Sequence, residues 1–193
     1  MTTFTAEPVV FVAPKKTTAA VALALAASLA AQIEDLAQSL ADEDIDESEF
    51  VTQARALLLA AGQDASVGLS DDAFVDKLVA GKMDYLDGFA SDVAGGGLSA
   101  AAIAQRSVLW GGIAYTAYQM AKASGAADSG DPKMTWSGTL DGATCDGCRE
   151  LIGTTRRASD WDVFPGDLEC SGNDRCDLDE AAAFARGAAY VLA

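Results

Sequence analysis

The sequence of 193 residues contains no histidine. Without histidine the chain cannot build Ser-His-Asp or Cys-His nucleophilic catalysis as ordinarily found, nor any metal site with an imidazole ligand. Basic residues are also scarce, because 13 Lys and Arg stand against 29 Asp and Glu, which gives a formal net charge of -16. A surface of this sign repels phosphate backbones. The composition therefore argues against direct nucleic-acid binding and favours docking on a basic surface of another protein.

Aromatic residues are few as well, at 7% of the chain, although half of the residues are hydrophobic and alanine dominates. This mixture favours closely packed helices over an aromatic-rich sheet. We predict an α+β protein that is mainly α, with a helical N-terminal body, a small zinc-stapled β-knuckle and a C-terminal helix. The expected regions are an extended arm (residues 1–16), the helical body (17–130) and a four-cysteine region with the terminal helix (131–193). The arm is either a strand that adds to a partner's sheet or a plain flexible terminus.

Apolar periodicity predicts a first helix over residues 18–41 and a second over 48–61, with Gly62 as its stop. A third helix begins at the cap Ser70 and carries an apolar face, and a fourth runs over residues 99–124. The expected apolar face of the third helix is Phe74, Leu78, Tyr85 and Phe89, and the glycines at 95–97 follow it as a hinge. The pair Gly111-Gly112 indicates a close helix crossing or a kink. Residues 133–140 read as a strand, and residues 177–193 as a closing helix capped by Asp177 and Asp179.

The apolar run at residues 19–31 follows Lys15 and Lys16, an arrangement that also occurs in secretory signals. The run is too short and too rich in alanine for a transmembrane span. Its helical periodicity continues to Leu40, which favours an amphipathic helix. We therefore predict no membrane contact.

The four cysteines suggest a metal centre. Cys145 and Cys148 form a C-x2-C pair, and Cys170 and Cys176 form a C-x5-C pair after 21 intervening residues. Asp146-Gly147 permits the sharp turn that aims the first two sulfurs at one point. Four thiolates in two pairs suit a structural, tetrahedral Zn²⁺ site, which has no open position for catalysis. Two disulfides and buried thiols without a ligand are the alternatives, and the spacing does not distinguish zinc from iron.

Residues 136–153, WSGTLDGATCDGCRELIG, resemble the C-terminal motif of phage Mu F-type minor head (head morphogenesis) proteins. That motif places a Trp strand before a C-x2-C pair, then a Leu and a Gly, and later a His-Pro-Asn-Cys-Arg-Cys element. Residues 173–176, NDRC, resemble the end of that element, and residues 103–118 resemble the helix before the Trp strand. The resemblance covers about residues 99–178. Asp174 stands where the family often has a cysteine, so Cys170 would supply that ligand from a shifted position.

The resemblance implies a virion structural protein, present in the host cytoplasm during assembly. Such a protein would be bound in several copies to a portal, major capsid or neck protein, act in head assembly or genome packaging and ejection, and catalyse no reaction. The alternative is a small zinc-ribbon regulator that contacts nucleic acid or a transcription complex. Its phosphate contacts would have to come from Arg149, Arg156, Arg157 and Arg175, which could equally pair with Asp160, Asp162 and Glu169. A redox role for the C-x2-C pair is opposed by the neighbouring carboxylates and the missing βαβ pattern.

Overall fold

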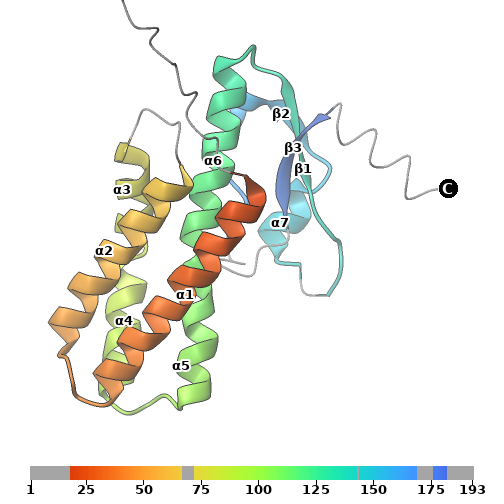
Figure 1. Ribbon diagram of the computed structural model, residues 1–193. Coiled ribbons are helices and arrows are strands. Elements are labelled where there is room, and N and C mark those ends of the chain that lie inside the picture. The colour runs from red at the N-terminus through yellow and green to blue at the C-terminus, as the bar shows by residue number, and fades with distance from the viewer. Residues whose placement is uncertain (1–17, 67–71, 143, 169–175, 182–193) are drawn as a thin grey trace, which may run out of the picture.

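The computed structural model describes residues 18–66, 72–142, 144–168 and 176–181. Within these residues, helices form a bundle and a small antiparallel sheet lies beside its α6 helix (Figure 1). The prediction of a mainly helical α+β protein is confirmed. The expected arm at residues 1–16 lies outside the described residues.

The first two helices, α1 (Ala19–Ala41) and α2 (Glu47–Ala65), pack side by side and begin at polar caps. The Thr18 hydroxyl accepts a hydrogen bond from the Val21 N–H at 3.3 Å. At α2 the Glu49 N–H donates to the Asp46 carboxylate at 2.8 Å, and the Asp46 N–H donates back to the Glu49 carboxylate at 3.2 Å. These caps satisfy N–H groups that have no partner inside the first turn.

The prediction that Gly62 ends the second helix is wrong, because α2 continues for three further residues to Ala65. Gly62 is buried, and a Cβ placed there would lie 2.6 Å from Val75 Cγ1 of α3 (Asp72–Ala80). The missing side chain lets α3 approach α2 closely. This glycine serves helix packing rather than helix termination.

The expected third helix is two helices, α3 and α4 (Met83–Ala94), separated at Gly81 and Lys82. The break changes the phase of the apolar face, so Leu86 and Phe89 are buried whereas Tyr85 is 76% exposed. The expected cap, Ser70, lies outside the described residues. The glycines at 95–97 do end α4, as predicted.

The expected fourth helix begins at its predicted start, where the Ser99 hydroxyl accepts a hydrogen bond from the Ala102 N–H at 3.3 Å and caps the helix. It consists of α5 (Ala100–Ser107), the 3-10 turn η1 (Val108–Gly111) and α6 (Gly112–Asp128). A Cβ at Gly111 would lie 2.7 Å from the Ala26 carbonyl oxygen of α1. Of the two explanations predicted for the glycine pair, a close crossing or a kink, the close crossing is present at Gly111.

The core of the bundle is a cluster of aliphatic and aromatic side chains from all of these helices. Phe89 lies between Phe50 and Trp110, with ring centroids 5.9 Å and 6.3 Å away. On α1 the inward face includes Leu29 and Ile33. The expectation that the apolar run is too short to span a membrane does not hold for α1 as a whole. Among the described helices, α1 is the one whose length and composition alone would allow it to cross a membrane, and 17% of its most apolar window is buried.

The sheet comprises β1 (Lys133–Ser137), β2 (Thr155–Arg157) and β3 (Asp177–Glu180) in the order β2-β1-β3, with both pairs antiparallel. A short helix, α7 (Asp146–Leu151), and a 3-10 turn, η2 (Ala158–Asp160), lie in the connections. We refer to β1, α7, β2, η2 and β3 together as the β-region. The central strand is shorter than the predicted range 133–140.

The prediction that a helix begins at Asp177 is wrong, because residues 177–180 form β3. Leu178 is fully buried opposite Trp136, whereas its two neighbours are half-buried. This alternation has the period of a strand, and the edge of β1 supplies the backbone partners that a strand needs. Residues 182–193, the rest of the expected helix, lie outside the described residues.

Candidate metal centre

Trp136 forms the centre of the β-region. Its side chain is 0% exposed, and its ring centroid lies 5.7 Å from that of Trp161. Its backbone N–H donates to the Thr154 carbonyl at 3.0 Å, and its carbonyl accepts from the Gly153 N–H at 2.8 Å. Gly153 has a φ of +87°, a conformation that glycine adopts without steric cost. The Trp and the Gly of the 136–153 motif are thus hydrogen-bonded partners that return the chain to β1.

Cys145 and Cys148 lie at the start of α7. Cys145 is the N-cap of this helix, and its sulfur accepts a hydrogen bond from the Cys148 N–H at 3.4 Å. Cys148 is 2% exposed, and Cys145 packs against the same buried cluster. The C-x2-C spacing therefore produces a helix start that turns both cysteines toward the core, as the Asp146-Gly147 turn predicts. An N–H that donates to sulfur stabilises the thiolate form, which is the form that binds metals.

Cys176 comes from the other side of the β-region, directly before β3. It is 5% exposed, and the Tyr115 hydroxyl of α6 donates to its carbonyl at 3.0 Å. A Cβ at Gly138 would lie 2.8 Å from the Cys176 sulfur and 3.1 Å from Ile152 Cδ1. The glycine after β1 thus leaves the space that the sulfur occupies.

Three of the four predicted ligands, Cys145, Cys148 and Cys176, lie close together beside the sheet. The fourth, Cys170, lies outside the described residues. Among the residues that the structure describes, no three His, Cys, Asp or Glu side chains are arranged as a ready metal-ligand set. The donor chemistry fits a thiolate zinc site. Three thiols belong to one apolar cluster, one of their sulfurs accepts a backbone N–H, and Gly138 leaves room for the sulfur of Cys176.

A polar clamp holds β3 on α6 next to Cys176. The Lys122 ammonium lies 2.7 Å from the Asp177 carboxylate and 3.2 Å from that of Asp179. The Ser137 hydroxyl donates to the other Asp179 oxygen at 2.9 Å. Partial burial lowers the pKa of Lys122, but the hydrogen bond to Asp177 and the charges of both carboxylates outweigh it, so the pKa lies above its ordinary value. The clamp and the Tyr115 hydrogen bond fix the strand that carries Cys176.

The clamp was not predicted from the sequence, because Asp177 and Asp179 were expected to cap a helix. The pattern Asp-Leu-Asp is the signal that could have revealed it, since alternate residues of a strand share one face. Gln119 of α6 supplies a further contact, where its side-chain oxygen accepts from the Leu178 N–H at 3.4 Å. No local pattern predicts that residue, because the two partners are 59 positions apart.

Comparisons of the chain with known protein families, with curated proteins and with solved structures find no match. The resemblance of residues 136–153 to minor head proteins therefore stays a prediction.

Proposed function

We propose that this protein is a bacteriophage virion structural protein of the minor capsid or head morphogenesis type, stapled by one structural Zn²⁺. The observation that carries the proposal is the convergence of Cys145, Cys148 and Cys176 beside the Trp136 strand. In the minor head motif that residues 136–153 resemble, a Trp strand, a C-x2-C pair and a glycine occur in this order. The backbone hydrogen bonds of Trp136 with Gly153 and Thr154 supply a physical reason for that order.

The proposed ligands are Cys145, Cys148, Cys170 and Cys176. A bound Zn²⁺ would supply a cross-link between the start of α7 and the segment before β3, and four thiolates would leave it no open coordination position. The chain's own residues would position the sulfurs through the α7 turn, the Tyr115 hydrogen bond and the Lys122 clamp. This role is structural, and we propose no catalysis.

The proposed partners are a portal, major capsid or neck protein, with several copies of this chain in each particle. An acidic chain with a net charge of -16 is suited to a basic protein surface rather than to nucleic acid. The described arginines of the β-region also have protein partners. Arg149 donates to the Thr144 carbonyl at 2.9 Å, Arg156 stacks over Trp161 at 4.8 Å, and Arg157 lies 3.5 Å from Asp131. These contacts oppose the alternative of a nucleic-acid-binding zinc ribbon.

The test is the location of the protein in infected cells. Gradient-purified particles should contain the chain at a fixed ratio to the portal subunit, as measured by quantitative mass spectrometry. Particles that lack the chain altogether would refute the virion role. A mobility-shift assay of the purified protein with duplex DNA at physiological salt supplies the second arm, in which we expect no specific complex. Tight sequence-specific binding would favour the regulator instead.

A further inference from the structure

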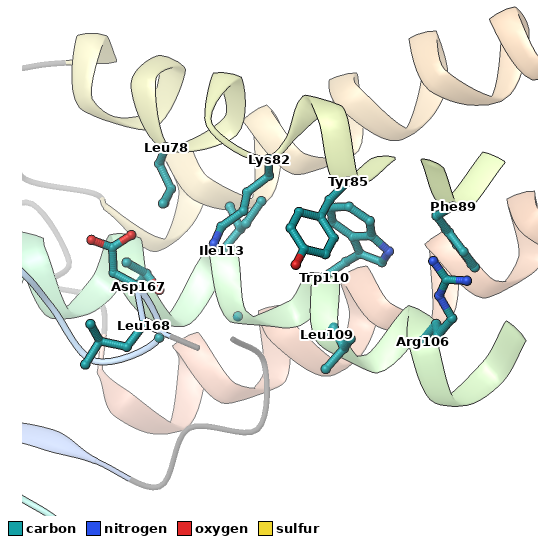
Figure 2. Close-up of a pocket in the computed structure, with 13 residues that line it drawn as sticks. Leu78, Lys82, Tyr85, Phe89, Arg106, Leu109, Trp110, Ile113, Asp167 and Leu168 are labelled. Atoms are coloured by element: carbon teal, nitrogen blue, oxygen red, sulfur yellow. The ribbon is translucent and has the colours of Figure 1, made fainter. Parts of the chain in front are cut away.

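A groove with a volume of about 470 Å³ lies between the helical body and the loop that ends at Leu168. Its walls come from α3, α4, α5, η1, α6 and the loop that ends at Leu168. Figure 2 shows Lys82 and Asp167 at one end of the groove, Arg106 and Phe89 at the other, and Tyr85 between them. The volume falls within the range of about 300–1,000 Å³ that is usual for ligand pockets.

The groove has an apolar floor and an exposed apolar rim. Trp110 and Ile113 are 8% and 3% exposed on the floor, whereas Tyr85 and Leu109 are 76% and 40% exposed at the rim. Six large hydrophobic side chains are exposed in the described part of the chain. Two of them, Tyr85 and Leu109, line the groove, and a third, Val108, is next to Leu109 in the sequence. A buried floor below exposed apolar side chains is the usual form of a site that accepts an anchor residue.

Each end of the groove contains a cation, although the chain as a whole is acidic. Residues 18–130 contain five Lys and Arg, of which Lys82 and Arg106 line the groove. Arg106 is held by Asp92 at 2.6 Å and lies 4.9 Å above the Phe89 ring. Lys82 forms no ion pair within 4.0 Å among the described residues, but the Asp167 carboxyl lies at the same end of the groove. Burial raises the pKa of Asp167 above its ordinary value, and the charges of Lys82 and Lys77 act against that shift. A ligand carboxylate would therefore compete with Asp167 for Lys82.

The wall of the groove also contains a polar atom without a partner. Thr116 is 1% exposed, and its hydroxyl has no hydrogen-bond partner in the described part of the chain. A Cβ at Gly166, which also lines the groove, would collide with this hydroxyl. Because burial of an unpaired hydroxyl costs free energy, a ligand that reaches Thr116 would gain from pairing with it.

We propose that this groove binds a polypeptide segment of a partner protein, in which a bulky apolar side chain lies next to a carboxylate. The apolar side chain would lie on Trp110 and Ile113, and the carboxylate would meet Lys82. A segment is favoured over a small molecule because Lys82 and Arg106 lie at opposite ends, with the apolar rim between them. The inference goes beyond the virion role and does not depend on it, since it concerns the purified chain and a peptide.

The test uses the full chain and a fluorescently labelled synthetic peptide, Gly-Asp-Leu-Phe-Asp-Gly, acetylated and amidated at its ends. Fluorescence anisotropy should show saturable binding with a Kd on the order of 100 μM, as suits one anchor and one charge. The same peptide with Ala in place of Leu and Phe should not bind. The peptide with Lys in place of Asp should bind about tenfold more weakly.

Three variants distinguish binding in the groove from a general effect on the protein. Leu109→Glu should weaken binding about tenfold, whereas Leu140→Glu should not, although Leu140 is also exposed, at 62%. Lys82→Glu should reverse the preference, so that the Lys peptide binds better than the Asp peptide. Such a reversal cannot arise from partial unfolding, and circular dichroism would verify the helices of each variant.

Three results would overturn the proposal. The first is the absence of saturable binding by the Asp peptide, and the second is an equal loss of binding in Leu109→Glu and Leu140→Glu. The third is binding of N-acetyl-phenylalaninamide as tight as that of the peptide, because it would assign the groove to a small molecule.

Discussion

In the helical body the buried cluster consists of aliphatic and aromatic side chains alone, whereas the buried cluster of the β-region has nine members, two of which are cysteines. Phe50, Phe89 and Trp110 fill the body with apolar area from three different helical segments. The β-region depends on Trp136 and Trp161, with two thiols beside them. Because a small core leaves little net free energy of folding, a region of this size needs an additional cross-link.

The two regions also differ in where their polar contacts lie. In the body most side-chain hydrogen bonds are local, as at the caps Asp46 and Ser99, and the contact of Arg106 with Asp92, 14 positions away, is the exception among the described residues. In the β-region they join distant segments, since Lys122 and Asp177 are 55 positions apart and Tyr115 and Cys176 are 61 apart. The body is therefore stabilised by burial, and the β-region by specific links. This difference tells us which changes should affect one region and spare the other.

Removal of the proposed metal should have the largest effect and should be confined to the β-region. We expect about one zinc per chain by elemental analysis, and we expect chelation or Cys148→Ser to unfold residues 136–178 while the helices persist. The physical reason is that the free energy of metal binding becomes free energy of folding where no site exists in the unfolded chain. Hydrogen exchange would follow the two regions separately, and far-UV circular dichroism would report the helices.

The control is the wild-type chain reloaded with zinc after chelation, which should regain protection of Trp136 and Leu178. Cys148→Ser should not regain it. Metal-free protein with four titratable thiols and an intact β-region, or protein with two disulfides, would contradict the zinc site.

Truncation of one large side chain in each core should separate the regions next. Trp136→Ala and Phe50→Ala each remove a side chain that is 0% exposed, and each should lower the free energy of unfolding by about 3–5 kcal/mol. Trp136→Ala should remove protection from the β-region and leave α1 and α2 protected. Phe50→Ala should lower the thermal midpoint of the body. If both variants instead show one unfolding transition, shifted by the same amount, the two regions unfold as one unit.

The body was more predictable from the sequence than the β-region. Apolar periodicity was enough to place the starts of α1 and α5 within one residue of the predicted positions, Thr18 and Ser99. The errors at Gly62 and at the break between α3 and α4 have one cause. A glycine ends a helix, interrupts it or permits close packing, and only the neighbouring helix decides among these roles.

For the candidate site, the C-x2-C spacing was enough to predict that Cys145 and Cys148 act as a pair. It was not enough to predict how Cys176 reaches them. Cys176 is placed by Tyr115 and by the pairing of β3 with β1, contacts that no short segment of sequence contains. The same limit explains the wrong helix at Asp177, because the partner strand overrides the local preference of an acidic segment.

A smaller effect, limited to the body, should come from the crossing of α1 and η1. Gly111→Ala would place a Cβ 2.7 Å from the Ala26 carbonyl oxygen and should cost about 1–3 kcal/mol of stability in chemical denaturation. Gly125→Ala is the matched control, since a Cβ at this α6 position meets nothing within 4 Å. That control should stabilise the chain by about 0.5–1 kcal/mol, because alanine favours the helix. Equal destabilisation by both variants would show that no tight crossing exists.

The smallest effect should come from the clamp on β3. Lys122→Met removes the ion pairs with Asp177 and Asp179 and should cost on the order of 1 kcal/mol, because the Lys122 side chain is 27% exposed and screened by solvent. Lys133→Met is the control, since Lys133 is exposed at the start of β1 and has no ion pair in the described part of the chain. The loss of stability should appear as faster hydrogen exchange in β3 and at the adjoining Cys176, and not in the rest of the chain.

The pH dependence of this cost tests the clamp independently. The two carboxylates raise the pKa of Lys122 in the folded chain above its unfolded value of about 10.4. A raised lysine pKa contributes stability that is fully present below the unfolded pKa and is lost as the pH rises through the folded pKa. Wild type should therefore exceed Lys122→Met in unfolding free energy by a constant amount between about pH 6 and 9, and the difference should vanish at more alkaline pH. A difference that stays constant through the titration of Lys122 would assign the effect to the packing of its methylene groups, and the charge of the clamp would then be dispensable for holding Cys176.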